Sequence, residues 1–92
     1  GMVAGRSPGS VIIAFYNPES VEAGEVHEYD VSSGEHLATW LVPGSPQVTC
    51  PLIWKSPEGD RLVVTTAAEN MSAEKWARYP LAGSMFVSDP WA

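Results

Sequence analysis

The side chains best suited to proton transfer or metal binding at neutral pH are the two histidines, His27 and His36. They occur in neighbouring segments, 25–31 and 35–42, that alternate as β-strands do and are joined by a short SSG connection. The sequence predicts that the two rings face each other on adjacent strands. Because two histidines without a third ligand make a poor zinc site, we expect cross-strand packing of the rings and no bound metal.

The carboxylate of Asp30 precedes a cluster of small turn residues, Ser32, Ser33 and Gly34. Oxygen ligands of this kind suit a hard cation. An aspartate before a turn more often accepts hydrogen bonds from the backbone of that turn. We expect the second role, in which Asp30 holds the turn together.

No serine or cysteine shows the sequence pattern of an activated nucleophile, and this holds for Ser45, Ser72 and Cys50 alike. Cys50 lies within an apolar run, so its thiol is expected to be packed and inert. As the single cysteine of the chain, it excludes an intramolecular disulfide and a cysteine-based zinc site. A lone cysteine is also compatible with a reducing compartment.

Glu69 and Asn70 are the predicted ligand-binding residues, because they follow the β-prone run 61–67 and loops at strand ends often line a site. No catalytic or metal-ligating residue is predicted. The large aromatic side chains suit stacking on a sugar, but in so small a chain we expect them in the core or a buried interface. They are Trp40, Trp54, Trp76, Trp91, Tyr16, Tyr29 and Tyr79.

The elements that must position these residues are short β-prone runs separated by glycine and proline. The run VIIAFY (11–16) is continuously apolar, which predicts a strand buried on both faces, with SPGS before it and NPES after it as stops. The strands over 25–31 and 35–42 complete a meander. In the first of these, alternation places Val26, Glu28 and Asp30 on one face; in the second, it places His36 with Ala38, Trp40 and Val42.

A second group of strands is predicted over 48–88. The strand 48–54 contains Pro51, which lacks a backbone donor and therefore favours an edge or a bulge. A turn over 55–60 leads into the β-branched strand 61–67. One short helix is predicted at 72–79, with Ser72 as its cap and Pro80 as its stop, and the last strand is 84–88.

Composition limits the function classes. With 5 basic and 11 acidic residues the net charge is -6, which argues against nucleic acid and anionic membranes as partners. No apolar run approaches the roughly 20 residues of a membrane span, so we expect a cytoplasmic protein. Gly1 is interpreted as a residue left from an expression tag before Met2. The 92 residues form a single all-β domain, 1–92, in this interpretation.

The two groups of strands, about 11–42 and about 48–88, each approach the roughly 40 residues of a propeller blade. The stretch 48–86, with Thr49-Cys50, VTTA (64–67) and YPLAG (79–83), resembles the last blade of the regucalcin and gluconolactonase (senescence marker protein) family of metal-dependent six-bladed β-propellers. The segments VIIAFYNPE and GEVHEYDVSSGEHLATWLVP are similar to the preceding blade. The resemblance therefore implies a partial propeller of two antiparallel meander sheets.

The sequence also departs from the pattern of this family. Where the family has an FGG turn, this chain has IWKS (53–56), and Ser84 replaces the second glycine of the AGG pattern. The family holds one divalent cation, such as calcium or zinc, with a Glu, an Asn and an Asp, and the cation activates water or polarises a lactone carbonyl. None of these three ligands can be assigned to a position of this sequence, so we expect no cofactor and no catalysis from the isolated chain.

Two function hypotheses follow. In the first, the chain is a truncated, non-catalytic member of this lactone hydrolase family. In the alternative, it is a free-standing β-module that binds a ligand or a protein. Two blades isolated from a propeller expose apolar faces and unpaired edges, so either hypothesis predicts self-association into a homo-oligomer that completes the sheets or a propeller-like ring.

Overall fold

The computed structural model describes residues 1–16 and 23–91, and the predicted stop signal NPES (17–20) lies outside them. Four strands form the first sheet, a meander in the antiparallel order β1-β2-β3-β4. They are β1 (Met2–Ala4), β2 (Ser10–Phe15), β3 (Ala23–Asp30) and β4 (His36–Pro43). The sequence did not predict β1, because a run of three residues carries too little alternation to identify a strand. The backbone of Gly1 joins this sheet, since its carbonyl accepts a hydrogen bond from the Ala14 amide.

Three strands form the second sheet, in the order β5-β6-β7. They are β5 (Val48–Ser56), β6 (Gly59–Thr66) and β7 (Met85–Val87). Strand β5 lies at the edge of this sheet, where the missing donor of Pro51 is tolerated, and the pairing shifts register between Val48 and Cys50. The strand continues through the IWKS segment, and Gly59, with φ 124°, ends the tight turn that follows. The all-β prediction, with two antiparallel meanders and one short helix, is confirmed.

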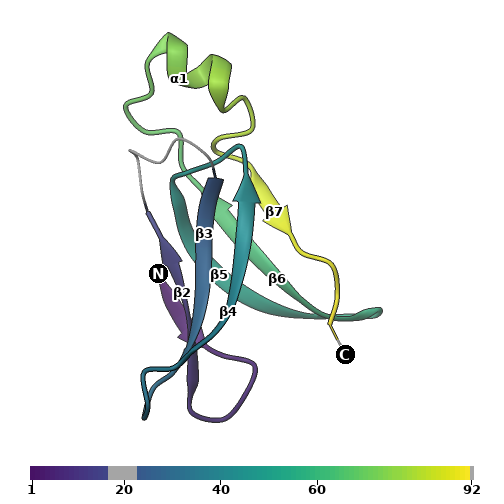
Figure 1. Cartoon of the computed structure of the whole chain (residues 1–92). Helices are drawn as coiled ribbons and strands as arrows, with labels where there is room; N and C mark the ends of the chain where they lie inside the picture. Colours follow the sequence, from purple (N-terminus) through teal and green to yellow (C-terminus); the bar gives the residue numbers. More distant parts are fainter. Residues whose placement is uncertain (17–22, 92) are drawn as a thin grey trace.

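The helix α1 (Ala73–Arg78) extends beyond one end of the two sheets (Figure 1) and buries none of its residues. Its cap is Ser72, whose hydroxyl accepts a hydrogen bond from the Lys75 amide at 3.2 Å, as predicted. The chain then turns back into β7 through Gly83, which adopts φ 89°. Ser84 is not among the described residues with positive φ, so the turn does not need a second glycine.

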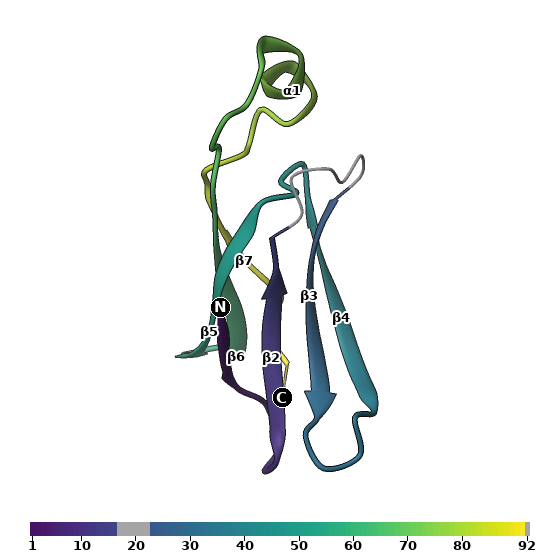
Figure 2. The same ribbon diagram turned by 90° about the vertical axis from the view of Figure 1, so that its left-hand side faces the viewer.

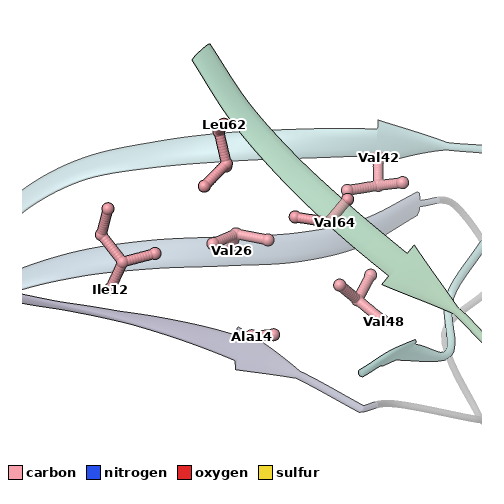
Figure 3. Packing of buried hydrophobic residues seen from close by; sticks show 7 residues of the cluster. All are labelled: Ile12, Ala14, Val26, Val42, Val48, Leu62 and Val64. Carbon is pink, nitrogen blue, oxygen red and sulfur yellow. The ribbon is translucent and has the colours of Figure 1, made fainter. Parts of the chain in front are cut away.

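The two sheets pack face to face and enclose one apolar core (Figure 2). The core residues come from five strands and point into the space between the sheets (Figure 3). They are Ile12, Ala14, Val26, Val42, Val48, Leu62 and Val64. The prediction that strand 11–16 is buried on both faces is wrong, because the second sheet covers one side only: Ile12 is fully buried whereas Phe15 is 39% exposed.

A β-bulge changes the face on which His36 lies. The pairing of β3 with β4 shifts register between Glu28 and Tyr29, so that Glu28 pairs with Ala38 and Tyr29 pairs with His36. The extra residue, Leu37, interrupts the alternation of β4. His36 therefore does not share a face with Ala38, Trp40 and Val42, as strict alternation predicted, but lies on the outer face beside His27 and Tyr29.

The link between the sheets, residues 44–47, is irregular, and most of it is buried. Ser45, Pro46 and Gln47 are all excluded from solvent. A side chain at Gly24 would collide with the carbonyl oxygen of Ser45 and the side chain of Val48, so the absence of a Cβ at this position allows the link to pass. This close approach sets the second sheet against the first.

Candidate functional site

The predicted ligand-binding residues, Glu69 and Asn70, are exposed, and Glu69 joins a small hydrogen-bond network. The Tyr16 hydroxyl donates to Glu69 Oε2 at 3.2 Å and to Gln47 Oε1 at 3.1 Å. Gln47 also accepts from the Glu69 amide at 3.0 Å and donates to its carbonyl at 3.2 Å. Desolvation, followed by the hydrogen bond and the negative charge of Glu69, raises the pKa of Tyr16. Glu69 thus connects the ends of the two sheets.

Asn70 has a backbone φ of 54°, a left-handed conformation that asparagine tolerates better than most residues. Its position in the turn after β6 explains the residue type without a ligand. Whether either residue binds a ligand stays a prediction.

The structural role predicted for Asp30 is confirmed. Its Oδ2 atom accepts hydrogen bonds from the hydroxyls of Ser33 at 2.7 Å and Ser32 at 3.2 Å, and its carbonyl accepts from the Gly34 amide. The hydrogen bond from Ser33 is the main cause that lowers the pKa of Asp30. This carboxylate closes the β3–β4 turn.

The structure shows where two of the nucleophile candidates, Cys50 and Ser45, lie. The prediction that Cys50 is packed is wrong, because the register of β5 turns its side chain to the face away from the core, where it is exposed. The Ser45 hydroxyl is fully buried and has no hydrogen-bond partner among the described residues, so no base activates it. Neither residue has the geometry of a catalytic nucleophile.

A buried carboxylate that was not among the predicted site residues lies on the core side of the first sheet. Glu28 is 1% exposed and accepts hydrogen bonds from the Ser10 hydroxyl at 2.7 Å, the Arg6 amide at 2.7 Å and Arg6 Nε at 2.6 Å. The Arg6 guanidinium lies over the rings of Trp40 and Trp91, at 5.0 and 5.6 Å from their centroids.

The surroundings of Glu28 act on its ionisation in opposite directions. Burial, the largest effect, opposes ionisation, but the hydrogen bonds from Ser10 and Arg6 together with the Arg6 charge outweigh it and lower the pKa of Glu28. One signal in the sequence pointed to this arrangement, because alternation placed Glu28 on the same face as Val26. Every described group near Glu28 is engaged in holding the fold, so we assign this cluster a structural role.

The outer face of the first sheet carries both histidines, and we call it the His face. The rings of His27 and His36 stack with centroids 4.7 Å apart and an angle of 27° between their planes. The facing of the two histidines is therefore as predicted. The members of the His face, taken from the strand register, are Met2, Ala4, Val11, Ile13, Phe15, Glu25, His27, Tyr29, His36, Thr39 and Leu41.

Hydrogen bonds fix the orientation of both imidazoles. His27 Nε2 lies 3.1 Å from Glu25 Oε1, and its Nδ1 lies 2.8 Å from the Tyr29 hydroxyl. Because a carboxylate only accepts, we assign the proton of the neutral His27 ring to Nε2 and let Nδ1 accept from Tyr29. His36 Nε2 lies 2.9 Å from the Ala38 carbonyl and 2.7 Å from Thr39 Oγ1.

The outer face of the second sheet is also apolar, and we call it the Trp face. From the register, its members are Cys50, Leu52, Trp54, Arg61, Val63, Thr65, Met85 and Val87. Leu52 is 57% exposed and Met85 is 65% exposed. Its single cation, Arg61, is 3.4 Å from Glu58 and donates to the Ser88 carbonyl. Both broad faces of the sandwich therefore expose apolar side chains to solvent, and on the His face these lie beside the exposed polar residues Glu25, His36 and Thr39.

An apolar groove opens between the sheets at the edge formed by β4 and β7. It has a volume of about 220 Å³ and is lined by side chains of both sheets. Trp40, Val42, Leu62, Val64 and Phe86 are among its lining residues. On the His face, a second depression of about 260 Å³ lies beside Phe15, Tyr16, Ala23, Glu25 and His27.

Within residues 1–16 and 23–91, no three side chains of His, Cys, Asp or Glu come together in an arrangement that could hold a metal ion. In the same part of the chain, every helix is too short or too polar to cross a membrane. No family model, no curated protein and no solved structure matches the chain. The candidate functional site is the pair of outer faces, because their exposed apolar side chains suit burial against another surface.

Proposed function

We propose that this chain is a non-catalytic β-module that assembles by stacking, with the His face of one copy on the Trp face of the next. The observation that carries the proposal is the exposure of large apolar side chains on both outer faces. On the His face, Phe15 is 39% and Leu41 is 67% exposed; on the Trp face, Leu52 is 57% and Val87 is 48% exposed. A monomeric soluble protein rarely exposes two such surfaces on opposite sides.

The size of the faces supports association between copies. The Cα atoms extend over 43 × 32 × 16 Å, so the molecule is a slab with two broad faces. Those broad dimensions leave room for the roughly 800 Å² per partner that a stable interface buries. Because the two faces differ, stacking is heterologous, and the chain of contacts either closes into a ring or continues as a filament.

The order of the strands supports the propeller interpretation of this assembly. A four-stranded meander is followed directly by a three-stranded meander packed on it, as successive blades are in a propeller. We propose on this basis, together with the sequence resemblance, that the chain is related to the regucalcin and gluconolactonase family. Three copies of a two-sheet unit would then complete a six-sheet ring.

Replacing Leu52 by Glu is expected to weaken self-association at least about tenfold, because it places a charge inside the proposed interface. The measurement is sedimentation velocity over a range of micromolar concentrations. The matched control is Leu81→Glu, since Leu81 is 53% exposed but follows α1, away from both outer faces. A wild-type chain that stays monomeric throughout would contradict the proposal.

A mixing experiment distinguishes stacking of unlike faces from pairing of like faces. Leu41→Glu damages the His face, and Leu52→Glu damages the Trp face. If unlike faces stack, the two variants do not assemble alone but form a heterodimer when mixed, through their remaining intact faces. If either variant forms homodimers as strong as those of the wild type, like faces are pairing instead.

The non-catalytic part of the proposal has its own test. We expect the isolated chain to hydrolyse simple aldonolactones no faster than buffer, with calcium, zinc or manganese added, because the described residues bring no three metal ligands together. Titration of lactone opening by pH-stat measures this. Turnover that EDTA abolishes would overturn the prediction and favour a functional hydrolase.

A further inference from the structure

Each outer face contains one charged side chain, counting Asp, Glu, Lys and Arg, and the two charges have opposite signs. On the His face this side chain is Glu25, and the face has no Lys or Arg. On the Trp face it is Arg61, and the face has no Asp or Glu. The two faces that are proposed to stack are therefore complementary in charge.

The Glu25 carboxylate needs a counter-ion if another copy covers it. Its side chain is 50% exposed, and within residues 1–16 and 23–91 it contacts one partner, His27 Nε2, at 3.1 Å. The N–H of the neutral His27 ring supplies a hydrogen bond but no charge. Because removing a carboxylate from water without a cation is unfavourable, an apolar cover alone would oppose stacking at this position.

Arg61 keeps hydrogen-bonding capacity for a partner on another copy. Its guanidinium carries five N–H groups. Within the described residues it donates to the Ser56 hydroxyl and the Ser88 carbonyl, each at 3.2 Å, and to Glu58 at 3.4 Å, which leaves two of the five. Glu58 is 63% exposed and lies on the turn between β5 and β6, outside the Trp face, so this ion pair is largely solvated. The planar guanidinium can therefore accept a second carboxylate partner.

We propose that Glu25 of one copy forms an ion pair with Arg61 of the next copy, and that this pair selects unlike faces for stacking. The inference rests on the proposed stacking and names the residues that determine which faces meet. A second His face offers Glu25 no cation, and a second Trp face offers Arg61 no carboxylate. Pairing of like faces would leave both charges unmatched under the cover.

The positions of the two residues determine how successive copies are oriented. Glu25 is the third residue of β3 and lies at the end of the first sheet from which the link 44–47 leaves. Arg61 lies beside the β5–β6 hairpin, at the end of the second sheet that is remote from the link (Figure 1). Contact between them turns each copy end for end relative to the one before. Stacking in that orientation continues as a filament, the second of the two outcomes that heterologous contacts allow.

The test is a double-mutant cycle on self-association, measured by sedimentation velocity. Glu25→Gln is expected to raise the dissociation constant at least about fivefold, and Arg61→Gln by a similar factor, because each leaves the other charge without its counter-ion. The two substitutions in one chain should raise it no further than either alone. Glu35→Gln is the matched control, because it removes an exposed carboxylate outside both faces and changes the net charge equally.

Reversing the pair is a second and more specific change. Glu25→Arg should weaken association at least about tenfold, because it places two cations together. The chain with both Glu25→Arg and Arg61→Glu carries the same pair in reverse and should regain an affinity within about threefold of the wild type. Thermal unfolding in dilute solution shows whether each variant is folded. If the reversed pair does not fold, the neutral cycle decides.

The outcomes separate the inference from the proposed function. Wild-type association that Glu25→Gln weakens no more than Glu35→Gln supports the stacking and overturns the ion pair. A closed complex of three copies also overturns the pair, because copies in a ring are not turned end for end. A wild-type chain that stays monomeric overturns both the pair and the stacking.

Discussion

Replacing Arg6 by Ala is expected to lower the free energy of unfolding by about 2 to 3 kcal/mol, because it leaves the buried Glu28 carboxylate without its cation. The value is set below the full cost of breaking a buried ion pair, since the Arg6 side chain is 34% exposed and partly screened by water. Loss of the contacts with Trp40 and Trp91 adds to the effect. For a domain of this size, the midpoint of thermal unfolding is expected to fall by about 10 to 20 °C.

The control for this substitution is Arg78→Ala. Arg78 forms an exposed ion pair with Glu74 at 3.6 Å within α1, and exposed pairs of this kind contribute little to stability. Chemical denaturation of the two variants, side by side with the wild type, gives the comparison. If Arg6→Ala were no more destabilising than Arg78→Ala, the buried pair would not be a structural anchor.

The same pair makes stability depend on pH in a definite direction. Because folding lowers the pKa of Glu28 from its usual value of 4.5, its contribution is fully present above that value. It is lost as the pH falls below 4.5 and through the lower folded-state pKa, where the native carboxylate also takes up a proton. Wild-type stability should therefore decrease over this acidic range more steeply than that of Arg6→Ala.

Replacing Ile12 by Ala is expected to cost about 3 to 4 kcal/mol, because Ile12 is completely buried between the sheets and its removal leaves a cavity. The matched variant is Ile13→Ala, with the same residue type on the same strand but on the outer face. Because Ile13 is only half-buried, its truncation should cost about 1 kcal/mol. Denaturant unfolding in dilute solution, below the micromolar range in which self-association is tested, measures the difference.

Equal losses for the two isoleucine variants would contradict the one-sided core. The comparison has a further use, because the difference should shrink as the protein concentration rises if another copy covers the His face. That concentration dependence would be absent in a chain that does not self-associate.

Local sequence signals predicted most of the elements correctly. The β-branched run 61–67, the capping Ser72, the stop at Pro80 and the turn after Asp30 each carry a short-range physical preference, and the structure has strand, helix and turns at these places. The facing of the two histidines also followed from their places on adjacent strands joined by a short turn. These are effects of a few neighbouring residues, so the sequence contains them.

The errors arose where a distant segment decided the outcome. Alternation in 35–42 grouped His36 with Ala38, Trp40 and Val42, whereas His36 lies on the opposite face, because one bulged residue opposite Glu28 and Tyr29 cannot be detected without the partner strand. The exposure of Cys50 and the half-burial of Ile13 likewise depend on which side the other sheet covers.

By itself the sequence determined an acidic all-β chain of two meanders with one short helix, because strand propensity, alternation and turn chemistry act locally. Only the tertiary structure decided which apolar face became the core, which carboxylate was buried against Arg6, and that two apolar faces remained outside. The physical reason is that VIIAFY and VTCPLIW are apolar on both sides of the strand. Their burial is a property of how the two sheets pack, and it is fixed by contacts between residues far apart in the chain.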